Sequence, residues 1–79
     1  MSKKALHLIF PSNLIREPTM FLVARDNHLV LSIRRAKITP TAGEATIELE
    51  GKLEDLERAE RIFKEKGVKV KNVLGDVIE

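Results

Sequence analysis

The 79-residue chain carries few side chains that could perform catalysis or hold a metal ion. It has no cysteine, which excludes thiolate metal sites, iron–sulfur ligation and a cysteine nucleophile within the chain. Its two histidines, His7 and His28, fall on the outward side of a predicted strand and in a predicted loop. A metal site needs three or four converging ligands, and the spacing of these residues resembles no ligand motif. We therefore expect no bound metal and no cofactor.

Acidic residues are concentrated in the segment 53–66, where they alternate with basic residues at helical spacing. Three pairs four residues apart are typical of a solvated helix face: Glu54–Arg58, Glu57–Arg61 and Glu60–Lys64. No serine stands in a nucleophile elbow, and the chain has no glycine-rich phosphate-binding loop. The sequence therefore predicts that the chain is not an enzyme.

One basic cluster, Arg34, Arg35 and Lys37, suggests nucleic-acid binding. RNA-recognition modules stack bases on exposed aromatic side chains, but this chain has no Tyr or Trp. All of its phenylalanines occupy predicted core positions: Phe10, Phe21 and Phe63. We expect Arg34 and Arg35 to lie beside Glu48 of a neighbouring strand, and we expect no nucleic-acid partner.

Composition is typical of a globular protein, with 43% apolar residues, 33% charged residues and a net charge of +2. No segment approaches the roughly 20 apolar residues of a membrane-spanning helix, and the basic N-terminus precedes too few apolar residues for a signal peptide. We expect one domain over residues 4–79, located in the cytoplasm without direct membrane insertion. A chain of this length buries only about 60–65% of its unfolded surface, so its core is marginal.

Two segments alternate between apolar and polar residues and predict strands with one buried face. They are residues 5–10 and residues 44–50. Between them, Pro18 is placed to begin a short helix, because its missing N–H is not needed in the first turn. Asn27 is the expected left-handed residue at the end of this helix.

Residues 29–38 predict a further strand, but its apolar residues change parity. Leu31 and Ile33 are odd-numbered, whereas Ala36 and Ile38 are even-numbered. A strand can place both pairs on one face only if it gains a residue between them. The sequence therefore predicts a β-bulge at Arg34 and Arg35, opposite Glu48.

Residues 53–66 predict an amphipathic helix that stops at Gly67. Its apolar stripe consists of Leu53, Leu56, Ala59, Ile62 and Phe63. A fourth strand begins at Val68, and the assignment of residues 74–79 is left open.

The element order is βαββαβ. With right-handed crossovers, it predicts an α+β, ferredoxin-like sandwich in which a four-stranded antiparallel sheet carries both helices on one face. The predicted core contains Leu6, Leu8, Phe10, Ile33, Ile47, Leu49, Leu56, Ile62, Phe63, Val68 and Val70.

Several short motifs of the chain resemble the NIL domain, a relative of the ACT domains. The motifs are Phe10-Pro11, Glu17-Pro18, Ala24-Arg25, Ser32-Ile33-Arg34 with Arg35-Ala36-Lys37-Ile38, Glu50-Gly51 and Gly67-Val68-Lys69-Val70. The resemblance covers residues 6–77. It departs from the family at Ser32-Ile33-Arg34, which stands where the family has Asn-Ile-Leu.

The resemblance implies a non-catalytic regulatory domain that binds a small molecule, an amino acid that can be methionine-like, and that acts as a homodimer. The implied ligand-binding residues are Ser32, Ile33 and Arg34. The family occurs in the ATPase subunits of methionine transporters and in ferredoxin-like proteins, so the implied protein partners are a transporter or a ferredoxin. The alternative is an assembly module that binds no small molecule. In either case we expect the dimer contact to include the long edge strand 29–38 or the residues flanking Ser32.

Overall fold

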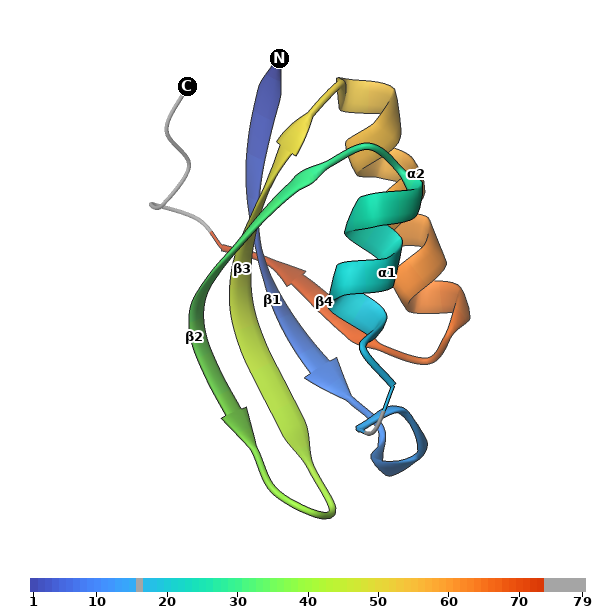
Figure 1. Cartoon of the computed structure of the whole chain (residues 1–79). Helices are drawn as coiled ribbons and strands as arrows, with labels where there is room; N and C mark the ends of the chain where they lie inside the picture. The colour runs from blue at the N-terminus through green and yellow to red at the C-terminus, as the bar shows by residue number, and fades with distance from the viewer. Residues whose placement is uncertain (16, 74–79) are drawn as a thin grey trace.

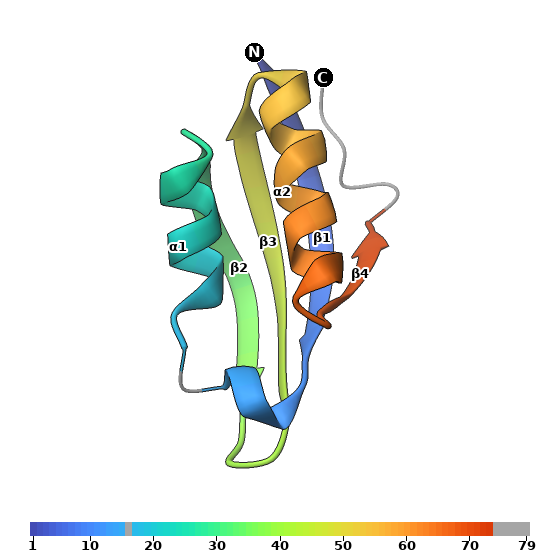
Figure 2. The same cartoon turned by 90° about the vertical axis from the view of Figure 1, so that its right-hand side faces the viewer.

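The computed structural model describes residues 1–15 and 17–73 of the chain and has the predicted α+β architecture. A four-stranded sheet of order β2-β3-β1-β4 is antiparallel throughout (Figure 1). Both helices cover one face of it (Figure 2). The elements are β1 (Ser2–Phe10), the 3-10 helix η1 (Ser12–Leu14), α1 (Thr19–Asp26), β2 (Val30–Ile38), β3 (Gly43–Gly51), α2 (Leu53–Glu65) and β4 (Lys69–Asn72). Residues 74–79, which include the expected domain end, lie outside the described residues.

The central strands β1 and β3 follow the alternation of the sequence. Leu6 pairs with Ile47 and Leu8 with Ala45, and all four side chains are buried on the face beneath the helices. From α2, the fully buried Phe63 packs into the same core. The predicted core is confirmed for most of its members, and Ile62 and Val70 pack against it while remaining partly exposed.

Three residues that were predicted at core positions or in the apolar stripe of a helix are exposed instead: Ile33 by 54%, Phe21 by 57% and Leu53 by 58%. The reason for Ile33 is the length of α1, which at eight residues extends about 12 Å, whereas the nine-residue β2 extends about 30 Å. As Figure 2 shows, α1 lies over only one end of β2. Leu53 is exposed at the first position of α2, and the buried side chain of this first turn is that of Asp55.

The predicted β-bulge is present, but Arg35 pairs with Thr46, two residues along β3 from the predicted partner Glu48. Ile33 pairs with Ile47 and Arg35 pairs with Thr46, so Arg34 is the extra residue. It does not lie opposite Glu48 in the ladder, because Ser32 holds that place. In the hairpin between β2 and β3, the Thr39 hydroxyl accepts the backbone N–H of Ala42 at 3.0 Å. The Arg34 side chain still reaches Glu48, at 3.0 Å, as predicted.

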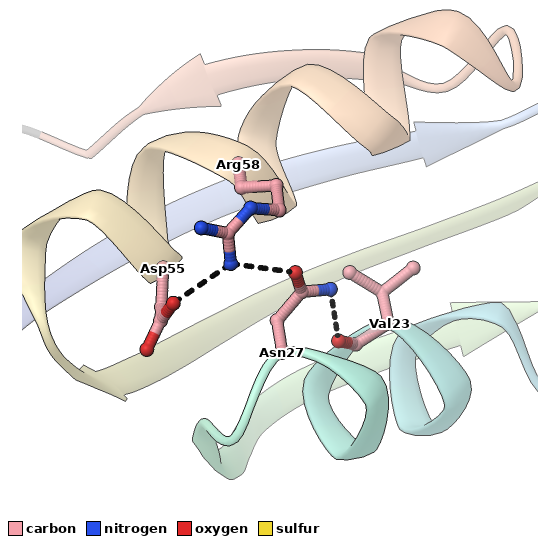
Figure 3. A network of polar contacts seen from close by, with 4 residues as sticks. All are labelled: Val23, Asn27, Asp55 and Arg58. Carbon is pink, nitrogen blue, oxygen red and sulfur yellow. Dashed lines mark hydrogen bonds and ion pairs between the residues drawn. The ribbon is translucent and has the colours of Figure 1, made fainter.

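A buried polar contact joins the end of α1 to the start of α2 (Figure 3). Asn27 is 3% exposed, and its side-chain amide donates to the Val23 carbonyl at 2.8 Å. Arg58 of α2 donates to the Asn27 side-chain oxygen at 3.5 Å and to Asp55 at 2.8 Å. Asp55, rather than the predicted Glu54, is therefore the acidic partner of Arg58.

The two helix ends differ in how well the sequence predicted them. The left-handed residue after α1 is His28, with φ of 58°, one position later than the prediction of Asn27. Asn27 keeps a negative φ because its amide turns inward to cap α1. Gly67 ends α2 with φ of 94°, as predicted, a conformation that costs little only for glycine.

Glu60 links α2 to the sheet through an ion pair. Its carboxylate lies 2.9 Å from the Lys4 ammonium of β1 and 3.3 Å from Lys64. The hydrogen bond from Lys4 and then the contact with Lys64 lower the pKa of Glu60 below its ordinary value of 4.5, against the opposing effect of burial. The ionised form is therefore favoured in the folded state.

Replacing Glu60 by glutamine should lower the free energy of unfolding more at pH 7 than at pH 3. A carboxylate with a lowered folded-state pKa stabilises the fold above its unfolded pKa, and this contribution is lost as the pH falls through the folded pKa. Urea denaturation of both proteins at the two pH values measures the difference. The exposed Glu57→Gln variant of the same helix is the control. If Glu60→Gln lowered the free energy of unfolding equally at both pH values, the ionised form of Glu60 would not be stabilising.

No helix within residues 1–15 and 17–73 is long and apolar enough to cross a membrane.

Candidate ligand groove and edge strand

Strand β2 forms one edge of the sheet and pairs only with β3 among the described strands. The bulge at Arg34 keeps its apolar residues on one face, as the parity change predicted. Leu31 and Ile33 pair with inward residues of β3 before the bulge, and Ala36 and Ile38 do so after it. Because α1 lies over only one end of the strand, Ile33 and Ile38 are 54% and 59% exposed.

An apolar groove of about 360 Å³ lies between this uncovered part of β2 and the segment that leads from η1 into α1. Its wall includes Leu14, Met20, Phe21, Leu31, Ile33 and Ile38. Glu17 is the one charged residue on the wall within the described part of the chain, and its carboxylate lies 3.3 Å from Lys66 at the end of α2. The groove therefore suits an apolar group, and the one carboxylate on its described wall is already paired with Lys66.

The structure separates the three residues that the family resemblance assigned to a ligand. Ile33 lies on the wall of the groove. Ser32 pairs with the outward-facing Glu48 in the ladder, and Arg34 reaches the same carboxylate. Adjacent strand residues point to opposite faces, so Ser32 and Arg34 lie on the face away from the groove.

Sequence reasoning missed most of the groove. Phe21 and Ile33 were predicted to lie in the core. Leu31 and Ile38 could have been assigned to the groove, because the predicted bulge already placed them on the same face as Ile33. No sequence signal marked the shortness of α1 relative to β2 as the reason for an open site.

His7 lies on the outer face of the sheet, as predicted, between two polar neighbours. Its Nδ1 is 3.1 Å from the Thr46 hydroxyl, and its Nε2 is 3.3 Å from the Glu44 carboxylate. Hydrolases use this order of hydroxyl, imidazole and carboxylate, but they place it in a cleft with oxyanion donors. Here Glu44 is half exposed, and the apolar groove opens on the opposite face. The arrangement is that of a cross-strand contact on an open sheet.

No group of three or more His, Cys, Asp or Glu residues in the described part of the chain is arranged to hold a metal ion.

The comparisons with known proteins agree with the fold. The family model that matches residues 4–72 describes the NIL domain. No curated protein matches the chain. Among solved structures, the chain is similar to the C-terminal domain of an ABC transporter ATP-binding protein from Enterococcus faecalis, with a TM-score of 0.80 and 18% identity. The match covers 95% of this chain and 88% of that one, and at this identity it shows a shared fold. Since the family model matches most of the chain, the protein belongs to the NIL domain family.

Proposed function

We propose that this NIL domain is a non-catalytic regulatory domain that binds a small apolar amino acid and acts as a homodimer formed through β2. The observation that carries the proposal is the apolar groove of about 360 Å³ beside β2, which lies within the size range of small-molecule sites of roughly 300–1,000 Å³. Ile33 would contact the side chain of the ligand, and Glu17 would accept its ammonium group. Ser32 and Arg34 would take part in the dimer contact.

The likeness to a C-terminal domain of a transporter ATP-binding protein supports a regulatory role beside a transporter ATPase. In this role the domain would act in the cytoplasm, where transporter ATPases hydrolyse ATP, and ligand binding would report the level of an amino acid to the ATPase. A ferredoxin-like protein is the other partner that the family resemblance implies.

One observation favours the alternative, an assembly module without a small-molecule ligand. An amino acid carries two charged groups, whereas the described wall of the groove offers one carboxylate, Glu17. A protein partner that inserted only apolar side chains would leave no charge unpaired. The two functions differ in whether a free amino acid stabilises the domain.

Thermal unfolding in the presence of single amino acids tests the proposal. An apolar amino acid at 100 times its Kd should stabilise the domain by about 2.7 kcal/mol, and Asp or Lys should not. Ile33→Glu should abolish this response because it places a charge in the groove. Leu53→Glu is the matched control, since Leu53 is equally exposed but does not line the groove.

Light scattering of the same samples separates the outcomes. A dimer that no amino acid stabilises would favour the assembly module. A monomer at high micromolar concentration, with and without amino acids, would contradict the homodimer.

A further inference from the structure

We infer that two copies of the chain pair antiparallel along the first half of β2, with the two-fold axis passing beside Ser32. This inference rests on the proposed homodimer and adds its register. It assigns a role to the bulge at Arg34, which ends the pairing. It also assigns one to Arg35 and Lys37, whose charges oppose pairing beyond the bulge.

Symmetry restricts where the axis can lie. An edge strand that pairs with its own copy in antiparallel orientation has the two-fold axis perpendicular to the sheet. A residue at a given number of steps before the axis then lies opposite the residue at the same number of steps after it in the partner. Directly opposite residues must point to the same face, so the axis passes beside a residue and not between two residues.

The bulge excludes a pairing that runs through it. With the axis at Ile33, Leu31 would lie opposite Arg35 of the partner copy. Leu31 pairs with Leu49 and points to the helix-covered face, whereas Arg35 pairs with Thr46 and points to the outer face. The two side chains would be on opposite faces, which an antiparallel ladder does not allow.

Charge excludes an axis beyond the bulge. At Arg35 or Lys37, a basic side chain would face its own copy. At Ala36, Arg35 would face Lys37 twice. Like charges directly opposite each other are destabilising. At Ile38, β2 ends, and Pro40 follows within two residues without an N–H to donate.

With the axis at Ser32, the five residues from Val30 to Arg34 can pair. Directly opposite residues then share a face, and no two basic residues lie opposite each other. On the helix-covered face, Leu31 lies opposite Ile33 of the other copy in two equivalent pairs. On the outer face, Val30 lies opposite Arg34. The pairing covers Val30 and Ile33, which are 59% and 54% exposed in the single chain. An axis at Leu31 would pair only three residues, because β2 begins at Val30.

The same register brings opposite charges together. Val30 pairs with Glu50 within its own sheet, so Arg34 of the other copy, which also reaches Glu48 of its own chain, lies two strands from Glu50. Two strand spacings are about 9.6 Å, a span that the long arginine and glutamate side chains can close. Arg35 and Lys37 lie beyond the start of β2 in the other copy and face no basic residue of that strand. The two apolar grooves open on the same face, one on each side of the seam.

Cysteine substitution tests the register directly, because the chain has no native cysteine. In the register with the axis at Ser32, the two Cα atoms of residue 32 are about 4.5–5.5 Å apart, within the disulfide range of about 4.4–6.8 Å. Ser32→Cys in the full chain should therefore give a covalent dimer as the main product of mild oxidation. Arg35→Cys should give only a trace, because its two copies are about 20 Å apart along the strands.

A mixture of two variants provides an independent test. Val30→Cys and Arg34→Cys should each remain uncrosslinked alone but form a mixed covalent dimer together, because residue 30 lies opposite residue 34. Self-crosslinking of Arg35→Cys at the level of Ser32→Cys, or failure of the mixed dimer to form, would overturn the register. If the unmodified chain scatters as a dimer while Ser32→Cys does not crosslink, the register is wrong and the homodimer stands. If the unmodified chain is a monomer and nothing crosslinks, both fall.

Discussion

Replacing Phe63 by alanine should lower the free energy of unfolding by about 3–5 kcal/mol, the usual cost of removing a large aromatic ring from a core. Phe63 is fully buried between α2 and the sheet. A domain of 79 residues has a total stability of about 4–12 kcal/mol, so the variant should be close to unfolding at room temperature. Urea denaturation followed by far-UV circular dichroism measures the loss, since the chain has no Trp or Tyr for fluorescence.

Phe21→Ala is the matched control, because it removes the same atoms from a ring that is 57% exposed. The Arg25 guanidinium lies 5.8 Å from the centre of the Phe21 ring, and an exposed contact of this kind contributes about 0.5–1 kcal/mol. The expected loss is therefore about 1 kcal/mol or less. Equal losses for the two variants would contradict the assignment of Phe63 to the core and of Phe21 to the groove.

This pair of residues illustrates what the sequence can predict about the fold. Periodicity identifies the face to which a side chain belongs. It placed Ile47 and Phe63 correctly, and it predicted a bulge from the parity change between Ile33 and Ala36. These features depend only on neighbours along the chain, because strand and helix geometry repeat over two or about four residues.

Burial depends in addition on what covers the face, and that is a property of distant segments. Ile33 lies on the predicted face but is exposed, because the eight residues of α1 cover only one end of β2. The same shortfall creates the groove. The exposure of Ile33 and the open groove therefore have one physical cause, the difference in length between α1 and β2.

The three ligand residues that the family resemblance implies do not lie on one face of the sheet, and the reason is the geometry of a strand. Ser32, Ile33 and Arg34 are consecutive, but consecutive residues of a strand cannot share a face. A three-residue motif in a strand can contribute to one site only through its middle residue or through its two flanking residues. In a dimer whose two-fold axis is perpendicular to the sheet, Ser32 and Arg34 of both copies stay on the outer face, so only Ile33 of the three can line a groove.

The contact of Asn27 between α1 and α2 yields the second large expected effect. Asn27→Ala should lower the free energy of unfolding by about 1–3 kcal/mol, because it removes a buried side-chain hydrogen bond to the Val23 carbonyl and leaves a small void. Asn27→Asp should be equally destabilising, since a carboxylate cannot donate to that carbonyl. Urea denaturation of both variants measures the loss, and Asp26→Ala, at the exposed neighbouring position, is the control.

A double-mutant cycle with Arg58 separates the two roles of Asn27. The bond from Arg58 to Asn27 is long, at 3.5 Å, whereas Arg58 reaches Asp55 at 2.8 Å. The Arg58 side chain is also 48% exposed, so its contacts contribute about 1 kcal/mol or less. We therefore expect Asn27→Ala and Arg58→Ala to be additive within about 0.5 kcal/mol. A coupling energy well above that value would mean that Asn27 stabilises the domain mainly by bridging the helices, and not by closing the end of α1.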